Sequence, residues 1–470
     1  MVRIAGLVSG PALFGAMAVL PAPAGFTPAS WTVAAVAVWI VVWWFTEAVP
    51  LAATALLPLL LFPLTGVRAL GVTASAYADP ILFLFLGGFV ISQAMQESGL
   101  HRRIAQFVVR RAGRRLAARL AGVMGATAFL SMWISNTASA IMMVPIALSV
   151  ARSVATGEDD GRRPVEAAFL LSVAYGASIG GVATLIGTPP NALAAAYLSR
   201  VHGIQIGFSQ WLLIGLPTVL VLLPVCWLML SRLVKSGAVA AEDGSQPARA
   251  LPLSRAEFAT AVVFATAAIA WIARPALNDL WPDIPIGDTT IALGAAVLLF
   301  ALPVRRADGA RLLGEENIAQ LPWQVLILFG GGLALAGAIA DTGLAEALGK
   351  EVAVLGGNSG FLVTVALIVF IVLLTEVTSN TATAAAFLPI AGAVAAQFGV
   401  DVLGVVAPVA LAASCAFMMP VATPPNAVIF GTGRISLAEM MRAGIRMNLV
   451  AMATLVGLAW LMPWGLIAAR

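Results

Sequence analysis

A short polar phrase occurs twice in an otherwise apolar chain. Residues 135–140 read Ser-Asn-Thr-Ala-Ser-Ala, and residues 379–384 read Ser-Asn-Thr-Ala-Thr-Ala, 244 residues later. Side chains of this kind cap helices, and a helix N-terminus offers free N–H groups and partial positive charge that suit a carboxylate. Capping alone would explain a single copy of the phrase. Two matched copies favour a binding site for a molecule with two carboxylates.

A second polar phrase is also repeated. Residues 188–191 and residues 423–426 both read Thr-Pro-Pro-Asn. Paired prolines remove backbone donors and break a helix, which frees carbonyl groups such as those of Gly187 and Ala422. Oxygen ligands of this sort suit a small alkali cation. A simple proline kink is the alternative, but the paired occurrence favours a binding break.

The composition is that of a polytopic membrane protein. Of the 470 residues, 61% are hydrophobic and only 10% are charged, which is more apolar than a soluble domain requires. Two cysteines and two histidines, Cys226, Cys415, His101 and His202, lie in apolar runs or at segment ends. They offer little to a disulfide framework, a zinc site or a catalytic triad. We therefore expect no enzyme, no organic cofactor and no nucleic-acid partner.

Apolar stretches long enough to cross a bilayer occur eleven times. They lie near residues 4–21, 29–47, 50–66, 79–98, 165–200, 208–233, 257–275, 286–304, 321–341, 402–430 and 447–467. Two further stretches, 118–150 and 355–397, carry the Ser-Asn-Thr phrase in the middle. We expect these to be re-entrant hairpins, because a polar break at membrane depth is tolerated only where protein or a cavity surrounds it. The predicted fold is an all-α membrane protein with eleven transmembrane helices and two hairpins.

The repeat also predicts the domain organisation. An N-terminal helix at 1–28 precedes a first repeat at 29–233, a cytoplasmic linker at 234–256 and a second repeat at 257–467. Each repeat holds five crossings and a hairpin, and one of the five crossings is a broken helix, near 165–200 or 402–430. Because five is odd, the two copies point in opposite directions and form an inverted repeat. The two hairpin tips should then meet near the midplane.

Basic residues predict the orientation of the chain. If the N-terminus is cytoplasmic, 21 of the 26 lysines and arginines fall in cytoplasmic stretches, which leaves the C-terminus outside. The basic stretch from Arg102 to Arg115 is typical of an amphipathic helix on the membrane surface. A cleaved signal peptide ending near Ala24 is the alternative for the first apolar stretch.

The absence of positive charge near the repeated phrases carries a further expectation. No lysine, arginine or histidine lies in the apolar part of either hairpin or beside either helix break. A charge at the bilayer centre costs roughly 2.5–3.5 kcal/mol on insertion scales, so a dianion needs accompanying cations, and sodium coupling follows. Glu376, three residues before Ser379, has two open roles: a structural one or tuning of the cation site.

With these motifs, the chain resembles the divalent anion/sodium symporter family of bacterial dicarboxylate and animal citrate transporters, over about residues 29–467. The resemblance implies a homodimer in the cell inner membrane, with a scaffold domain and a transport domain that moves by an elevator-type shift. Two sodium sites follow from the same resemblance. The first would use Ser131, Ser135, Asn136 and the carbonyl of Gly187; the second would use Thr375, the backbone of Thr378, Asn380 and the carbonyl of Ala422.

The resemblance also implies a substrate site. The carboxylates would be held by Ser135, Asn136, Thr137, Ser379, Asn380 and Thr381, with Thr188, Thr423 and Pro424 lining the pocket. The expected function is sodium-coupled symport of C4-dicarboxylates such as succinate, malate or fumarate into the cell. A sodium-independent exchanger should carry basic residues near the pocket, and the sequence shows none there. A citrate or sulfate carrier of the same architecture and, from a different class, an anion channel are further alternatives.

Overall fold

The computed structural model describes residues 2–113, 115–154, 159–233, 252–303, 311–356 and 359–468. Within these ranges the regular structure is helical, and the only pairing of extended backbone is an isolated bridge between Pro303 and Arg311. Eight helices in the described ranges are long and apolar enough to cross a membrane. The all-α prediction is confirmed, while the number of eleven crossings stays a prediction. Most of the expected linker at 234–256 lies outside the described residues.

The first half of the chain runs from α1 to α12. Its helices are α1 (Val2–Val19), α2 (Pro28–Thr46), α3 (Leu51–Thr54), α4 (Leu57–Leu64), α5 (Leu70–Ala74), α6 (Pro80–Glu97), α7 (Leu100–Arg111), α8 (Leu116–Ser131), α9 (Asn136–Val154), α10 (Asp159–Gly181), α11 (Pro189–His202) and α12 (Phe208–Leu233). The apolar stretch near 50–66, expected to be one crossing, holds two short helices, α3 and α4. Pro58 occupies the first turn of α4, where a missing N–H costs nothing, so the chain restarts a helix there after the short α3.

The second half runs from α13 to α23. Its helices are α13 (Arg255–Leu280), α14 (Asp288–Ala301), α15 (Glu315–Ala319), α16 (Trp323–Asp341), α17 (Leu344–Gly356), α18 (Gly360–Leu374), α19 (Asn380–Phe398), α20 (Val402–Ala413), α21 (Pro424–Phe430), α22 (Leu437–Leu461) and α23 (Trp464–Ala468). The last long helix was expected to begin at 447 and begins ten residues earlier. Ser436 and Glu439 form a capping box there, so the polar first turns belong to the helix.

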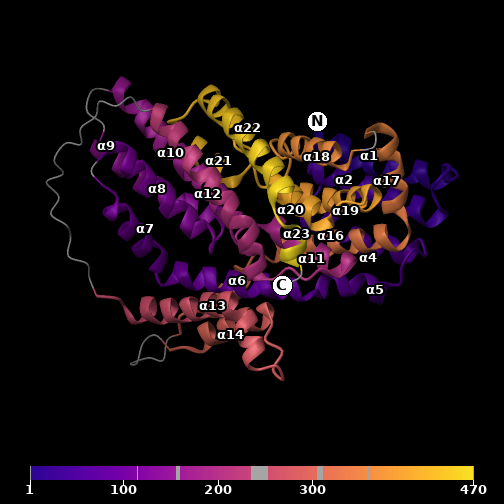
Figure 1. Ribbon diagram of the computed structural model, residues 1–470, viewed down its shortest axis with the longest axis horizontal. Coiled ribbons are helices and arrows are strands. Elements are labelled where there is room, and N and C mark those ends of the chain that lie inside the picture. Colours follow the sequence, from indigo (N-terminus) through magenta and orange to yellow (C-terminus); the bar gives the residue numbers. More distant parts are fainter. Residues whose placement is uncertain are drawn as a thin grey trace.

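The two halves share one order of elements. In each half two helices meet at the Ser-Asn-Thr phrase: α8 with α9, and α18 with α19. In each half a helix also stops before Thr-Pro-Pro-Asn, and the next one starts at its first proline. Figure 1 places α8 and α9 toward one end of the long axis and α18 and α19 toward the other. The two helix pairs thus approach the centre from opposite ends.

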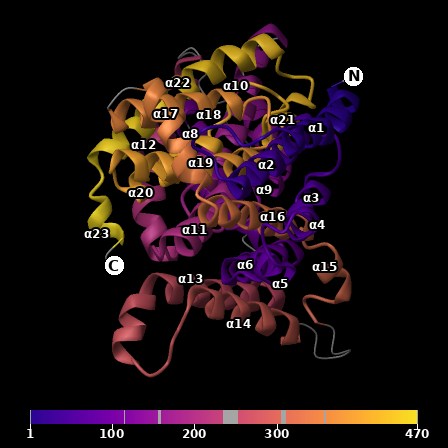
Figure 2. The same ribbon diagram turned by 90° about the vertical axis from the view of Figure 1, so that its right-hand side faces the viewer.

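Packing separates a central group of helices from a flanking layer. The pairs α8–α10, α9–α10, α19–α20 and α11–α19 pack closely, and α10, α11, α19 and α20 are largely buried. Helix α14 packs on α6, and Figure 2 shows α13 and α14 as a layer at the edge of the molecule. Large apolar side chains remain exposed on outer helices, as Leu220 of α12 and Ile269 of α13 illustrate. Such surfaces suit contact with lipid.

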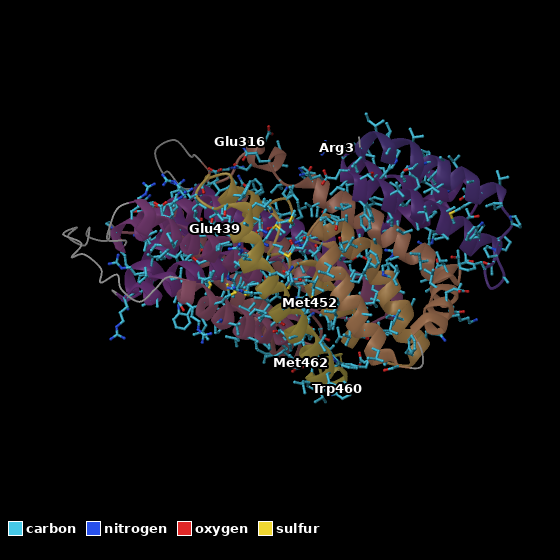
Figure 3. The ribbon with its side chains drawn as sticks, turned by 90° about the horizontal axis from the view of Figure 1, so that it is seen from above. Arg3, Glu316, Glu439, Met452, Trp460 and Met462 are labelled. Carbon is cyan, nitrogen blue, oxygen red and sulfur yellow. The ribbon has the colours of Figure 1, made fainter. Side chains whose placement is uncertain are left out.

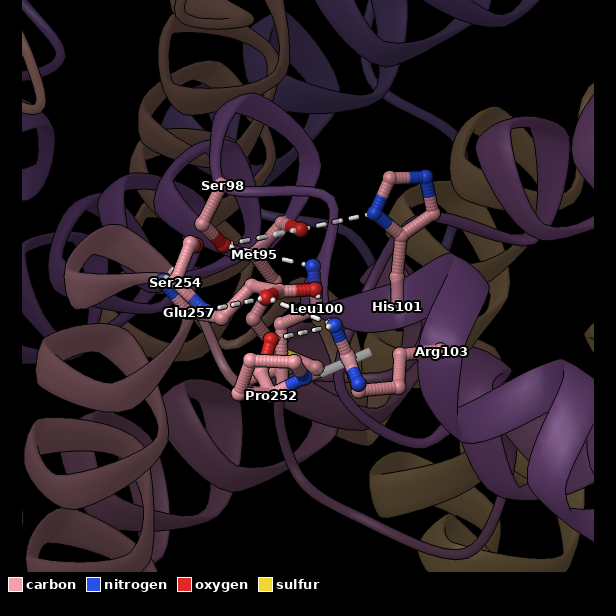
Figure 4. A network of polar contacts seen from close by, with 8 residues as sticks. All are labelled: Met95, Ser98, Leu100, His101, Arg103, Pro252, Ser254 and Glu257. Carbon is pink, nitrogen blue, oxygen red and sulfur yellow. Dashed lines mark hydrogen bonds and ion pairs between the residues drawn. The ribbon is translucent and has the colours of Figure 1, made fainter. Parts of the chain in front are cut away.

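A polar network holds α7 against the start of α13 (Figure 4). The Arg103 guanidinium donates to both carboxylate oxygens of Glu257, at 2.8 and 3.0 Å. Glu257 also completes the capping box of Ser254 at the N-terminus of α13. On the other side of α7, the Nδ1 atom of His101 lies 2.7 Å from the carbonyl oxygen of Met95. The network fixes the amphipathic α7 across the ends of two longer helices.

Candidate functional site

The two hairpin tips are built alike but capped differently. The Ser135 hydroxyl accepts a hydrogen bond from the Ala138 N–H at 3.2 Å and so caps α9. Ser379 occupies the N-cap position of α19, yet its side chain makes no capping bond. The capping role expected from the sequence is therefore found at the first tip and not at the second. At the second tip the hydroxyl is left for other partners.

A matched pair of side-chain oxygens lies behind each tip. The Ser131 hydroxyl donates to Asn136 Oδ1 at 2.5 Å, and the Thr375 hydroxyl donates to Asn380 Oδ1 at 2.7 Å. In both halves the two residues are five positions apart, so the last turn of one helix meets the first turn of the next. Each tip therefore gathers neutral oxygens of the kind that coordinate hard cations.

The Thr378 side chain is held at the second tip by two local bonds. Its hydroxyl donates to the Leu374 carbonyl at 2.8 Å and lies 2.7 Å from the Thr383 hydroxyl. These bonds keep the side chain within the tip. The contribution of its backbone to a cation site, expected from the resemblance, stays a prediction.

The helix breaks are held by their asparagines. Asn191 Nδ2 donates to the carbonyls of Gly181 at 3.2 Å and Thr184 at 2.8 Å. Asn426 Nδ2 donates in the same way to carbonyls in the second break, those of Ala416 and Met419. Both asparagines are fully buried. They shape the break loops. Neither asparagine lines the cavity, although the repeated Asn after Pro-Pro resembles a pair of binding residues.

One cavity of about 750 Å³ joins both tips and both breaks. This volume is within the roughly 300–1,000 Å³ common for small-molecule sites. The predicted site residues on its lining are Ser135, Asn136, Thr137, Gly187, Thr188, Thr378, Ser379, Asn380, Thr381, Ala422, Thr423 and Pro424. Two predicted residues, Ser131 and Thr375, are buried behind it and reach it through their bonds to the tip asparagines. Residues 244 positions apart in the chain thus face the same space.

The rest of the cavity wall comes from elements that the motifs do not mark. The end of α2, the middle of α6 and the start of α16 contribute Trp44, Phe85, Phe89, Ser92 and Gln324. Aromatic side chains therefore share the cavity with the hydroxyl, amide and backbone groups of the tips and breaks. A largely apolar lining with a few polar groups is typical of small-molecule sites.

The expectation that no basic residue approaches the pocket is wrong. Arg3, from the first turn of α1, lines the cavity, and its Nη2 atom lies 3.0 Å from Glu47 Oε2. The hairpins and breaks themselves contribute no lysine, arginine or histidine to the described lining, as predicted. Sequence reasoning missed Arg3 because only the packing of α1 on α2 carries it from the chain end to the cavity.

Glu376 accepts hydrogen bonds from an unusual set of donors. Its carboxylate, 2% exposed, accepts from the backbone N–H groups of Phe417 at 2.7 Å and Met419 at 2.8 Å. The Met418 N–H lies 3.0 Å from both carboxylate oxygens, and Asn448 Nδ2 donates at 2.7 Å. These donors lie in the loop between α20 and α21 and on α22. Of the two roles left open by the sequence, the contacts favour the structural one.

The first half has no counterpart of this carboxylate. The position 244 residues before Glu376 is Met132, whose carbonyl accepts a 2.5 Å hydrogen bond from the Thr184 hydroxyl. The first break is thus tied to its tip through a threonine, and the second through a buried acid. The two halves share backbone geometry but differ in how each break is attached.

An all-helical chain with candidate membrane spans, two helix tips and two helix breaks around one central cavity has the architecture of a membrane transporter. Among the described residues, no group of three histidine, cysteine, aspartate or glutamate side chains could hold a metal ion. The profile of the sodium:sulfate symporter transmembrane region matches residues 2–467. The chain belongs to this family, as the resemblance in the sequence predicted, and is a multi-pass membrane transporter rather than an enzyme.

Curated relatives match over nearly the whole chain. The sodium-dependent dicarboxylate transporter SdcS of Staphylococcus saprophyticus is 38% identical over 467 residues, which cover 97% of this chain and 90% of the relative. SdcS of Staphylococcus aureus strain USA300 is 38% identical over 462 residues, covering 96% and 89%.

Two solved structures share the fold at low sequence identity. The YdaH transporter of Alcanivorax borkumensis aligns with a TM-score of 0.61 at 15% identity, covering 82% of this chain and 86% of that one. MtrF of Neisseria gonorrhoeae, described with a class of antimetabolite efflux pumps, aligns with a TM-score of 0.57 at 15% identity, covering 87% and 85%. At this identity the likeness concerns the fold alone.

Proposed function

We propose that the protein imports C4-dicarboxylates such as succinate, malate or fumarate, coupled to sodium ions. The observation that carries the proposal is the single cavity lined by both Ser-Asn-Thr tips and both helix breaks. Two relatives at 38% identity, named sodium-dependent dicarboxylate transporters, support the same substrate and ion.

Each tip offers one carboxylate site. At the first tip, Ser135, Asn136 and Thr137 present side chains and the free N–H groups of the α9 N-terminus. At the second tip, the corresponding groups belong to Ser379, Asn380 and Thr381 at the start of α19. A dicarboxylate of four carbons would bridge the tips, with Thr188, Thr423 and Pro424 beside it.

Sodium ions would neutralise the dianion from behind the tips. The oxygens that would hold the first ion are those of Ser131, Ser135, Asn136 and the Gly187 carbonyl. The second would use Thr375, the backbone of Thr378, Asn380 and the Ala422 carbonyl. The Ser131–Asn136 and Thr375–Asn380 bonds support this assignment, because they already gather neutral oxygens at matching places. An ion there lowers the cost of placing a carboxylate at the adjacent helix end.

Movement, assembly and orientation are part of the same proposal. The hairpins and broken helices would form the transport domain and shift as a unit against a scaffold that includes α6, α13 and α14. The close packing of α8, α9 and α10, and of α11, α19 and α20, supports such a unit. The protein would be a homodimer in the cell inner membrane, with its N-terminus in the cytoplasm and its C-terminus outside.

A sodium-independent dicarboxylate exchanger is the second candidate, and Arg3 is the observation that favours it. A basic side chain in the cavity could offset substrate charge without a cation. However, Glu47 lies 3.0 Å from Arg3 and lines the same cavity, so the two residues together carry no net positive charge to offset a dianion, whichever group pairs with Arg3. We therefore keep sodium coupling as the proposal.

Uptake of labelled succinate into proteoliposomes separates these functions. Vesicles receive an inward gradient of sodium, potassium or protons, or contain unlabelled succinate with no gradient. We expect accumulation with the sodium gradient alone, because only bound sodium offsets the dianion. Stimulation by internal succinate that is indifferent to sodium would establish the exchanger instead. Competition by citrate or sulfate in the same vesicles defines the substrate range.

A further inference from the structure

One ion pair lies in the central cavity. Arg3 and Glu47 are the only charged residues among the described residues that line it, and their side chains are 72% and 55% exposed. An exposed pair of this kind is weak, since both charges stay hydrated and solvent screens them. A carboxylate from solution can therefore replace Glu47 as the partner of Arg3 at little cost.

Helix α1 is docked in a way that delivers Arg3 to this place. Its only buried residues are Gly6 and Gly10, four positions apart, and a Cβ atom on either would collide with α2 side chains, Thr46 or Trp43. Small residues at this spacing let two membrane helices approach closely. Figure 2 shows α1 beside α2, and Figure 3 shows Arg3 near the middle of the long axis rather than at either end.

Glu47 is held in an uncommon backbone conformation. It ends α2 with φ 46° and is the one non-glycine residue with positive φ in the described part of the chain. Glycine or asparagine is the usual residue at such a helix end. A glutamate there accepts backbone strain, and strain of this kind clusters at functional sites. The strained position directs its carboxylate to Arg3.

We propose that Arg3 is a substrate-capture residue at the cytoplasmic end of the cavity, where the proposed orientation places the first turn of α1, and that Glu47 is its resting counter-ion, displaced by one carboxylate of a dianion in the cavity. The inference rests on the proposed function, since it needs a dicarboxylate to enter this cavity. A pair with no net charge does not steer a dianion from a distance, so the contact with Arg3 raises the apparent affinity for a substrate that has already entered the cavity. It leaves the turnover of the loaded transporter unchanged, because the tips and breaks still hold the substrate.

The test combines succinate uptake and succinate binding for a set of charge variants. Arg3→Gln should raise the KM for succinate about three- to tenfold with an unchanged maximal rate, and this excess in KM should shrink at high ionic strength, because the variant leaves Glu47 unpaired in the cavity and salt screens its repulsion of the dianion. The matched control is Arg111→Gln, which removes one positive charge from α7, where the Arg111 guanidinium lies over the Phe107 ring. A charge swap, Arg3→Glu with Glu47→Arg, should restore the KM that Arg3→Glu alone raises.

A second variant tests the docking of α1 independently of the charge. Gly6→Leu should push α1 from α2 and reproduce the rise in KM, while size-exclusion chromatography verifies that the protein stays folded. If Arg3→Gln behaves like Arg111→Gln, or the charge swap rescues nothing, the capture role is refuted and the transport proposal is unaffected. If the transporter proves to be an exchanger, calorimetric titration with succinate, in sodium and in potassium, replaces the uptake assay. The wild type, Arg3→Gln and Arg111→Gln are then compared by their Kd for succinate. Absence of succinate binding to the wild type would overturn both proposals.

Discussion

Asn136 and Asn380 occupy the same place in the two hairpin tips. Each begins a helix, faces the cavity, and accepts a hydroxyl hydrogen bond through its Oδ1 atom, from Ser131 or from Thr375. A single side chain therefore touches the substrate space on one side and the paired oxygens on the other. Coupling between cation and anion would pass through these two amides.

Replacing either asparagine should stop coupled uptake. We expect Asn136→Ala and Asn380→Ala each to lower sodium-driven succinate uptake about tenfold or more, because each loses an oxygen ligand and a hydrogen-bond partner at once. Asn278→Ala is the matched control, since Asn278 bonds to Ile286 near the end of α13, away from the cavity. Near-normal uptake by both tip variants would remove the tips from the mechanism.

Glu376 should matter for stability as well as for transport. Glu376→Gln leaves one oxygen for the backbone donors of the break and adds an N–H group that faces them, so at least one buried donor loses its partner. A buried unsatisfied donor costs about 1–3 kcal/mol. We expect a lower Tm in detergent for Glu376→Gln and a larger drop for Glu376→Ala. Glu439→Gln, at the exposed cap of α22, should change the Tm little; equal Tm values for all these proteins would contradict the role.

At the scale of elements, the order of helices repeats while their attachments differ. The first break is tied to its tip through the Thr184 hydroxyl, and the second through the Glu376 carboxylate. Helix α1 precedes the predicted first repeat, so no helix of the second repeat corresponds to it, and its first residues line part of the cavity. The repeated tips and breaks therefore form the candidate site. Features found in one half only, such as Glu376 and helix α1, change how a break is attached or add to the cavity wall.

The α6–α7 junction should weaken in acid. Burial lowers the pKa of His101 below its ordinary value of 6.5, with the nearby Arg102 adding to the effect and the Met95 carbonyl opposing it. The neutral imidazole is thus the form that stabilises the folded state, and this stability is lost as the pH falls below about 6.5, toward the folded pKa. Tm should fall between pH 7.5 and pH 5.5 more in the wild type than in His101→Gln. Parallel curves would exclude His101 as the titrating group.

At the scale of the whole molecule, the orientation in the membrane can be tested with single cysteines. Basic loops stay in the cytoplasm, which places Arg111 inside and Lys350 outside. Arg111→Cys should resist a membrane-impermeant maleimide in intact cells, and Lys350→Cys should react. The native Cys226 and Cys415 are buried, so background labelling should be low. The reverse pattern would invert the proposed topology, and lysed cells provide the control for reactivity at both positions.

Much of the site could be predicted from local residue types. A helix starts at each Ser-Asn-Thr phrase, although only Ser135 caps its helix with its side chain, and another helix stops before each Thr-Pro-Pro-Asn phrase, where the prolines remove donors. Their repetition predicted that both tips and both breaks face one space, and the cavity lining includes nearly all of the residues concerned. Their roles in binding stay a prediction. Helix ends with charged residues in the first turns were harder to predict from the sequence. At Ser436, a capping box extends α22 beyond its apolar part.

The sequence by itself determined the membrane-spanning helical class, the duplicated tips and breaks, and the family, because each depends on composition or on neighbouring residues. Only the tertiary structure decided what meets across long separations: Arg3 with Glu47, Glu376 with the 417–419 backbone, and the aromatic side chains of α2 and α6 that line the same cavity as the tips. Those contacts depend on how closely whole helices pack, as at Gly6 and Gly10. Packing distance is a property of two surfaces together, and no local pattern in one segment contains it.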